Sequence, residues 1–485
     1  MPRWLAAVAL LLLATWVFVD RHRFLSGSPD PLGIDGYWYA VQLRSLLDTG
    51  HLHYPGAPLA LWIMAPLAAL TDPVAGVKLG AALAAAALPV AVYALARRIA
   101  GERAIALAAA GLAATSAGAF YLPTEFVKSA VGLPIAVAAL AALGWALERP
   151  SRRRALLPAA LLVAAGLCHK LALAFALVGW IAPIAVSLVG RARTSRVRRQ
   201  WLLLGLIAAA LALLVAPDPA VRAGLFTAEA DWSIPALRDG AGGLHFRGEP
   251  ALAGAFGLAA LGLLILGRRL PALRPAVPAH SLSLAVGPAL WAIATALPWL
   301  DAGDPQGLTF RLRAIAFLPL ALTAAAVAAA VLARLSRSRR MVVFMFATGL
   351  LLVRPARYEA PVVRVDPDLA AAVAAAGPAL APGAVIVAPE RHIVFMATWY
   401  TGAPARLRPE PVPPARRARL IPASYMSEAL ARAIDEARSA AVAPPVSLHR
   451  GHPDGLVLVT EPTWEWLLAR LPAAERDHYR AWPVH

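Results

Sequence analysis

The chain has 485 residues, of which 60% are apolar and only 15% are charged, and its mean hydropathy is +0.63. This composition excludes an ordinary soluble protein, because the apolar residues fall in blocks of about 15 to 23, the length of membrane-spanning helices. The formal net charge of +18 comes from short basic clusters between these blocks, without the basic and aromatic stripe of a nucleic-acid-binding protein. We therefore expect a polytopic membrane protein with no nucleic-acid partner. The single cysteine, Cys168, excludes an internal disulfide.

The first apolar segment, residues 4–19, follows Arg3 and resembles either a signal peptide or an anchor. Pro29 directly follows the small residues that would form a cleavage site, which favours an uncleaved anchor. With it, the chain has about eleven predicted spans, of which the others lie near residues 74–96, 104–120, 128–147, 155–168, 171–190, 201–216, 250–267, 280–298, 313–333 and 341–354.

Arginine clusters occupy alternate connections between these spans, at residues 97–103, 149–154, 191–199, 268–274 and 334–340. The intervening connections hold most of the acidic residues of this part of the chain. Because arginine-rich loops stay in the cytoplasm, we expect a cytoplasmic N-terminus and an outward-facing C-terminal segment. Counting residues 57–70 as a crossing would reverse this pattern, so this short, proline-broken segment is predicted to be interfacial or re-entrant.

From about residue 355 the apolar blocks stop, and short helical and strand patterns alternate. We expect strands at "GAVIVAP", "PARLRP" and "GLVLVT", with helices between them. The predicted organisation is a transmembrane domain at residues 1–354, with a first outer loop at 20–73, and a small extracytoplasmic α/β domain at 355–485. No glycine-rich phosphate loop or hydrolase elbow occurs in the tail.

The first outer loop contains the polar stretch "GIDGYWYAVQLRSLLDTGHLHYPG", residues 33–56. Its helical spacing predicts an amphipathic helix from Gly36 to Asp48, with Asp35 at the start. Asp35 has two interpretations: it caps the first amides of this helix, or its carboxylate has a chemical role. Arg44 and Asp48 form an i, i+4 pair that is typical of a solvated helix face.

The segments "GIDGYWYAVQLRSLLDTGHLHYPGAPLALWIMAPLAAL" and "VKLGAALAAAALPVAVYALARRIAG", after a first membrane helix, resemble the start of the GT-C superfamily of polyprenyl-phosphate-dependent glycosyltransferases. This superfamily includes protein mannosyltransferases and bacterial lipopolysaccharide glycosyltransferases. The resemblance covers roughly the first 200 residues and implies a multi-pass protein of a bacterial-type inner membrane. It implies transfer of a hexose or pentose from a polyprenyl-phosphate donor to a glycolipid, glycan or protein acceptor at the outer face.

The resemblance also implies that Asp35 is the catalytic base, because the superfamily has an acidic residue in its first outer loop. Members often have a pair of acids there, whereas Gly36 and Tyr37 follow Asp35 in this chain. The departure leaves open whether a divalent metal ion takes part. His51 and His53 could join Asp35 at such a metal, or they are polar surface residues of the loop.

Transfer from a polyprenyl phosphate needs positive charge at the departing phosphate. The chain has only three lysines, and two of them, Lys128 and Lys170, are predicted in short outward loops. We interpret Lys128 and the His169–Lys170 pair as phosphate ligands, because a compact ammonium suits a phosphate oxygen. The alternative is that both lysines extend to lipid headgroups.

Three other charged residues are further candidates for substrate binding. Arg311 and Arg313 open a predicted helix and could contact the phosphate, although an arginine at a helix end is ordinarily an interfacial anchor. Glu125 is either a second acid of the site or an ion-pair partner of Lys128, three residues further on.

Two other functional classes stay open on the sequence. A transporter needs ionisable residues at mid-membrane depth and paired broken helices, whereas here the charges are predicted at the outer ends of the spans. A non-catalytic membrane assembly protein would use the C-terminal segment to bind a partner.

Overall fold

The computed structural model describes residues 1–33, 35–148, 151–189, 248–269, 283–296, 312–332, 367–389, 391–407, 412–439, 447–448 and 456–480. The chain divides into two compact units. The helical unit contains Met1–Gly27, Tyr54–Leu70 and Lys78–Pro361, and the mixed unit contains Ser28–His53, Thr71–Val77 and Val362–His485. The first outer loop predicted at residues 20–73 is thus divided between the two units.

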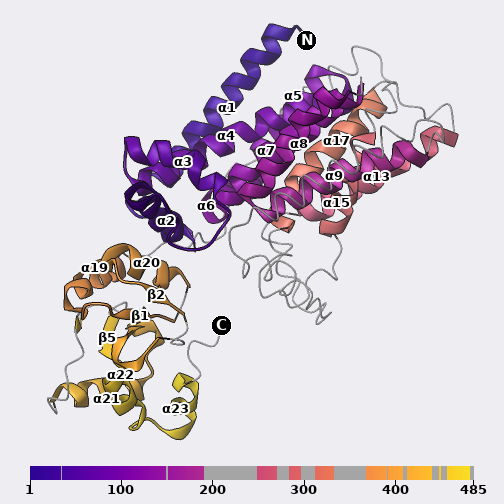
Figure 1. The fold of residues 1–485 in the computed structure, drawn as a ribbon. Helices are drawn as coiled ribbons and strands as arrows, with labels where there is room; N and C mark the ends of the chain where they lie inside the picture. The colour runs from indigo at the N-terminus through magenta and orange to yellow at the C-terminus, as the bar shows by residue number, and fades with distance from the viewer. Residues whose placement is uncertain are drawn as a thin grey trace. The chain divides into compact units, whose positions relative to one another are not determined.

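The helical unit is a bundle of packed helices (Figure 1). Its described elements are α1 (Arg3–Leu25), α3 (Leu59–Leu70), most of α4 (Pro73–Ala100), α5 (Arg103–Ala114), α6 (Ala117–Glu125), α7 (Val127–Glu148), α8 (Arg152–Cys168), α9 (Lys170–Val189), α13 (Glu249–Arg269), α15 (Val286–Ala296) and α17 (Phe317–Leu332). The short helix α3, predicted to be interfacial or re-entrant, packs against α7 and α8.

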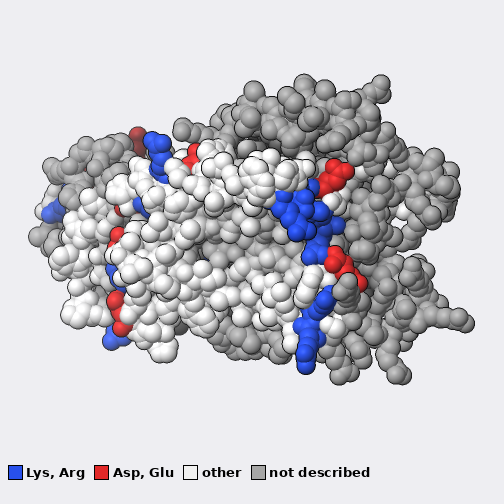
Figure 2. Space-filling model, turned by 90° about the horizontal axis from the view of Figure 1, so that it is seen from above, with Lys and Arg blue, Asp and Glu red and all other residues white. Residues whose placement is uncertain are grey.

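Four of the described helices, α1, α4, α7 and α13, are long and apolar enough to cross a membrane, or five if the bent pair α5 and α6 is one span. The chain is therefore a multi-pass membrane protein. In the face shown in Figure 2, a broad uncharged surface separates groups of charged side chains, as a lipid-facing belt requires. The number of eleven spans stays a prediction, and those expected at 201–216 and 341–354 lie outside the described residues.

Charged residues define the two ends of the helical unit. At the arginine end, Arg98 pairs with Glu148, the last residue of α7, and Arg103 donates a hydrogen bond of 3.0 Å to the carbonyl of Met1. Lys128 lies at the opposite end of α7, about 30 Å away, and no charged residue lies between. We call this opposite end the lysine end. The N-terminus therefore lies with the arginines.

Small residues bring the helices of this unit close together. A Cβ atom on Gly287 of α15 would lie 2.4 Å from the Cα of Gly179 in α9, and one on Gly118 of α6 would lie 2.0 Å from the carbonyl oxygen of Ala314. Many of the buried side chains are alanine. Close backbone approach through glycine and alanine is the usual packing of membrane helices, where no hydrophobic effect drives association.

The span predicted at residues 104–120 is broken in the structure. α5 ends at Ala114 and α6 begins at Ala117, with a bend of 52° between them. Charged side chains bind both free helix ends, because Arg21 donates to the carbonyl of Ala114 (3.1 Å) and Glu249 accepts from the amide of Ala117 (2.9 Å). A cation at a helix C-terminus and an anion at a helix N-terminus are both favourable, and they compensate the backbone groups that the break leaves without helical partners.

The mixed unit contains a five-stranded sheet in the order β2-β1-β3-β5-β4. The strands are β1 (Val385–Val387), β2 (Ala405–Arg406), β3 (Arg417–Pro422), β4 (Ser447–Leu448) and β5 (Leu456–Thr460). β1 is parallel to β2 and β3, whereas β5 is antiparallel to β3 and β4. The unit's helices are α2 (Gly36–Thr49), α19 (Pro367–Ala376), α20 (Arg391–Thr401), α21 (Glu428–Ser439), α22 (Glu461–Leu468) and α23 (Ala473–Arg480). The predicted α/β content of the tail is confirmed.

The central strand β3 is missing from the sequence-based prediction. Arg417 and Arg419 interrupt its apolar pattern, and only the folded unit supplies their partner, Glu461 at the start of α22. Arg419 binds both carboxylate oxygens of Glu461, at 2.9 and 3.0 Å. Although burial raises the pKa of Glu461, the hydrogen bonds and charges of Arg419 and Arg417 outweigh it and lower that pKa below its usual value.

Candidate active site

Two predicted ligands lie at the starts of helices on the lysine end. Lys128 is the second residue of α7, and Lys170 is the first residue of α9. α7, α8 and α9 pack against one another, and α8 leads back from the arginine end to the lysine end. The two lysines, 42 positions apart in the sequence, therefore lie on neighbouring helix N-termini.

A hydrogen bond joins these two helix starts. His169 lies between α8 and α9 in an extended conformation, and its Nδ1 lies 3.1 Å from the Oγ of Ser129 in α7. The same nitrogen accepts a hydrogen bond of 3.1 Å from the backbone amide of Leu171. Because Nδ1 is an acceptor, Ser129 donates to it and the neutral ring carries its proton on Nε2. His169 thus caps an amide of α9 and binds α7.

Gly132 permits the close approach of α7 to the break between α8 and α9. A Cβ atom on Gly132 would lie 2.8 Å from the Cβ of Ala172 and 3.1 Å from that of Cys168. Both neighbours are rigid Cβ atoms, so they cannot rotate out of the way. Any larger residue at position 132 would separate the two helix starts.

The helix dipoles at the lysine end add to the charge of the lysines. A helix N-terminus carries a partial positive charge, so a lysine in the first turn opposes the helix dipole by about 0.3–1 kcal/mol. Here two neighbouring helices each have a lysine in that turn. A bound phosphate would reverse the sign of the effect, because it would interact favourably with both lysines and both helix N-termini.

Glu125 and Arg313, two further candidates, are both buried. Glu125 is buried at the end of α6, and α7 begins two residues later, so the expected i, i+3 relation with Lys128 does not lie within one helix. Arg313 is also buried, but its neighbour Ala314 contacts the start of α6 at Gly118, about 10 Å along that helix from Glu125. Arg311 lies outside the described residues.

The third lysine of the chain is a candidate that the sequence analysis did not select. α4 runs from the lysine end to the arginine end, because Arg97 and Arg98 lie in its last turn. Lys78, near its start, is 7% exposed. All three lysines of the chain thus lie at one end of the bundle and all the arginines of the α4–α5 connection at the other. The rarity of lysine among 46 basic residues was the available signal.

Asp35 lies in the mixed unit, directly before α2. It occupies the N-cap position, but its side chain makes no capping hydrogen bond, so the capping interpretation is wrong. Its backbone (φ −93°, ψ 7°) adopts the bridge conformation that recurs at active sites. The carboxylate is partly buried, with one oxygen out of contact with solvent. The chemical role of Asp35 stays a prediction.

The histidines of the first outer loop do not form a metal site with Asp35 in the described part of the chain. Among the described residues, no three His, Cys, Asp or Glu side chains form a group that could hold a metal ion. His51 is exposed. Burial lowers the pKa of His53, and the charge of Arg44 lowers it further, so His53 is neutral at pH 7.

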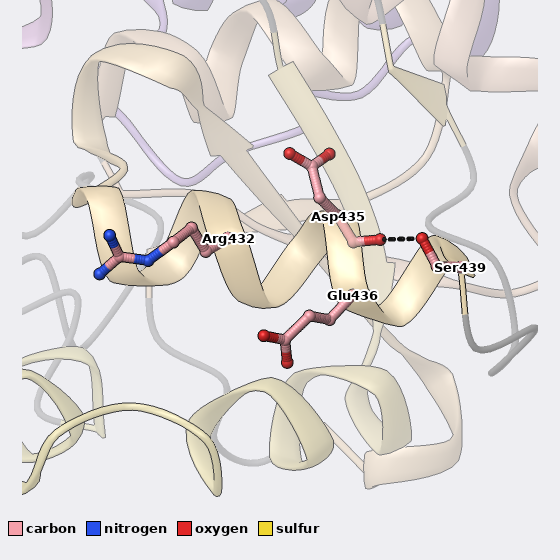
Figure 3. Close-up of a pocket in the computed structure, with 4 residues that line it drawn as sticks. All are labelled: Arg432, Asp435, Glu436 and Ser439. Atoms are coloured by element: carbon pink, nitrogen blue, oxygen red, sulfur yellow. Dashed lines mark hydrogen bonds between the residues drawn. The ribbon is translucent and has the colours of Figure 1, made fainter.

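Two surface pockets differ in the residues that line them. One of about 540 Å³ lies along α21 and is lined by Arg432, Asp435, Glu436 and Ser439 (Figure 3). In this view the two carboxylates point in different directions and Arg432 points away from both, so these side chains do not converge on a ligand. The other, in the helical unit, has a volume of about 410 Å³ and combines polar and apolar walls: Trp16, Val19, Asp20, Arg23, Phe24 and Phe120.

This architecture is similar to that of known proteins. A family described as "Dolichyl-phosphate-mannose-protein mannosyltransferase" matches residues 55–217, about a third of the chain. The structure of ArnT from Cupriavidus metallidurans bound to undecaprenyl phosphate is similar, with a TM-score of 0.53, 14% sequence identity, and coverage of 94% of this chain and 98% of ArnT. The apo structure of the same protein gives a TM-score of 0.54 at the same identity and coverage. The chain has the fold of a GT-C glycosyltransferase.

The predicted resemblance and fold class are thereby confirmed. The family match contains Lys78, Lys128, His169 and Lys170, but it begins after Asp35. No curated protein matches the chain in sequence. The GT-C fold is therefore recognised through helix arrangement far more than through residue identity.

The close contact at Gly132 predicts a specific pattern of stability. Gly132→Ala is expected to destabilise the protein by about 1–3 kcal/mol, because the new methyl group overlaps Ala172. Adding Ala172→Gly should restore part of the loss. Thermal unfolding in detergent measures both effects. Gly262→Ala in α13 is the matched control, since open space surrounds that position, and it should be neutral or slightly stabilising. Equal unfolding temperatures for Gly132→Ala and the parent would contradict the tight approach.

Proposed function

We propose that this protein is a membrane glycosyltransferase that moves a sugar from a polyprenyl-phosphate donor to an envelope acceptor. The observation that carries the proposal is the pair of neighbouring helix N-termini, each with a lysine in its first turn, at one end of the helical unit. This arrangement suits a phosphate at the membrane surface. The lipid named for the ArnT structure, undecaprenyl phosphate, has that chemistry.

In the proposed site, Lys128 and Lys170 bind the donor phosphate, and the Nε2–H of His169 donates a further hydrogen bond. These three donors stabilise the negative charge that grows on the phosphate as the bond from the sugar breaks. Glu125 is buried and, as a carboxylate, orients Lys128 or contacts the sugar hydroxyls. Arg313 and Arg311 would be secondary ligands, and His53 a neighbour of Asp35.

Asp35 is the proposed base. The acceptor hydroxyl attacks the anomeric carbon, its proton passes to the Asp35 carboxylate, and the bond between the anomeric carbon and the phosphate oxygen breaks. Polyprenyl phosphate leaves with the bonding electron pair. The acceptor is a glycolipid, a glycan or a protein of the envelope, and membrane lipids surround the helical unit.

The positions of charges favour this reaction over transport. Within the described parts of α4, α7, α9, α13 and α17, charged side chains occur toward the helix ends and not at mid-depth. A transport pathway needs ionisable groups near the membrane centre. Chemistry at one membrane face needs them at the ends of the helices.

We further propose that the lysine end and the C-terminal domain face the outside of a bacterial-type plasma membrane, with the N-terminus in the cytoplasm. The N-terminus lies beside the arginines of the α4–α5 connection, and arginine-rich loops are retained in the cytoplasm.

The phosphate site predicts a loss of donor use without a loss of stability. Lys128→Ala and Lys170→Ala should each lower kcat/KM by about ten- to a hundredfold, because each removes a charge-assisted hydrogen bond to phosphate. Lys128→Arg should recover part of the activity. Turnover of an undecaprenyl-phosphate-linked sugar by the purified protein measures the effect. Arg153→Ala, an exposed site at the arginine end, is the control. Parental turnover by both lysine variants would make these side chains headgroup anchors.

The role of Asp35 predicts a large loss from a nearly isosteric change. Asp35→Asn keeps the size and polarity of the side chain but removes its basicity, so transfer should fall by roughly a hundredfold or more. Asp48→Asn in the same helix changes an exposed carboxylate and should be nearly silent. The turnover rates of the two variants, compared at equal thermal stability, test whether the Asp35 carboxylate is the base. An active Asp35→Asn variant would remove the base from the mechanism and favour a transporter or assembly protein.

The proposed orientation predicts which single cysteines are labelled in intact spheroplasts. In a Cys168→Ala background, cysteines at Ser28 and at exposed Ser439 of α21 should react with a membrane-impermeant thiol reagent. A cysteine at exposed Glu102, in the arginine-rich connection, should react only after lysis. The reverse pattern would invert the topology and place the lysines in the cytoplasm.

A further inference from the structure

The helix that follows Asp35 is docked on a helix of the C-terminal domain. Within the mixed unit, α2 packs against α20, which lies more than 340 positions further along the chain. Residues Gly36–Leu43, the first half of α2, are all buried. The predicted surface helix is therefore covered along the half that begins at Asp35.

Arg44 makes the most specific contact of this interface. Its guanidinium donates to the carbonyl oxygens of Trp399 (2.8 Å) and Thr398 (3.1 Å) and lies 4.3 Å above the indole ring of Trp399. Both carbonyls belong to the last turn of α20, where the helix dipole is negative, and the Thr398 carbonyl also accepts from the amide of Gly402. Arg44 thus caps the C-terminus of α20. The expectation that Arg44 lies on a solvated face with Asp48 is wrong.

A second contact lies on the other side of Asp35 in the sequence. The hydroxyl groups of Tyr37 and Tyr400 both donate to one carboxylate oxygen of Asp30, at 2.7 and 2.9 Å. Burial raises the pKa of both tyrosines, so both remain neutral donors. Asp30 in the loop, Tyr37 in α2 and Tyr400 in α20 therefore form one hydrogen-bonded cluster.

The contacts of Asp30 and Arg44 with α20 flank Asp35 in the sequence. Asp30 lies five residues before it and Arg44 nine residues after it, and both bind α20. Between them, a Cβ atom on Gly36 would lie 3.0 Å from the Cβ of Pro31, so the loop is packed closely on the start of α2. The backbone of Asp35 is thus held from both sides by a helix that belongs to the C-terminal domain.

We propose that α20 positions the carboxylate of Asp35, with Arg44 and Tyr400 as its positioning residues. This inference rests on the proposed function and gives the C-terminal domain a part in the chemical step. Arg44 acts through Asp35 and does not bind the donor. Displacement of a reacting group by about 1 Å costs up to a hundredfold in rate, so loss of this docking lowers kcat while donor binding at the lysines is retained.

The test uses the full-length protein and the variants Arg44→Ala and Arg44→Lys. Arg470→Ala is the matched control. Arg470 also lies over a tryptophan ring, that of Trp466 in α22, but outside the α2–α20 interface. Hydrogen exchange of residues 36–49 and 391–401 measures docking independently of any reaction. Turnover of the undecaprenyl-phosphate-linked sugar that the parent consumes gives kcat and KM.

Arg44→Ala should speed exchange in both segments and lower kcat by about ten- to a hundredfold, with KM within about twofold of the parent. Arg44→Lys should recover part of both, because one ammonium can still bind a carbonyl at the helix end. Arg470→Ala should change neither. A parental kcat for Arg44→Ala, beside an inactive Asp35→Asn variant, would overturn the positioning role and leave the proposed function intact. A fully active Asp35→Asn variant would instead refute the proposed base, and the positioning role with it.

Discussion

Every helix end in this protein needs partners for its backbone groups, and a bilayer core offers none. At several of the described helix ends, charged and polar side chains meet this need. Arg21 and Glu249 bind the two ends at the α5–α6 break, His169 binds an amide of α9, and Arg44 binds the last carbonyls of α20. These contacts decide where the helices stop, and the helix ends in turn position the candidate site.

At the lysine end, the residue that satisfies a helix start also brings two positively charged helix starts together. His169 satisfies the start of α9 and, through Ser129, fixes the start of α7 beside it. Two dipoles of the same sign then lie close together, and two lysines add to that charge. In the proposed function, a bound lipid phosphate would interact favourably with both lysines and both helix N-termini.

The mixed unit links the two ends of the sequence. Its sheet and helices come from the tail, but α2 and the loop before it come from the first outer loop. The similarity in fold to ArnT covers 94% of the chain, so it includes most of the tail as well as the helical unit. Through the packing of α2 on α20, the tail buries the first half of the helix that follows Asp35.

The sequence by itself determined the membrane class and predicted the apolar spans and the candidates Lys128, His169 and Lys170, whereas Asp35 was chosen through the family resemblance. These follow from local properties, because segment length, apolar composition and the rarity of lysine are written in consecutive residues. The sequence did not determine the break at Ala114, the strand β3 or the role of Arg44. Arg44 has an acidic residue four positions away, and Arg417 and Arg419 interrupt the apolar pattern of β3. Local patterns therefore place these three arginine side chains in solvent. Only the tertiary structure supplies their partners: Trp399 for Arg44, 355 positions away, and Glu461 for Arg417, more than 40 positions away. The partner of a charged side chain depends on which distant segments fold against it.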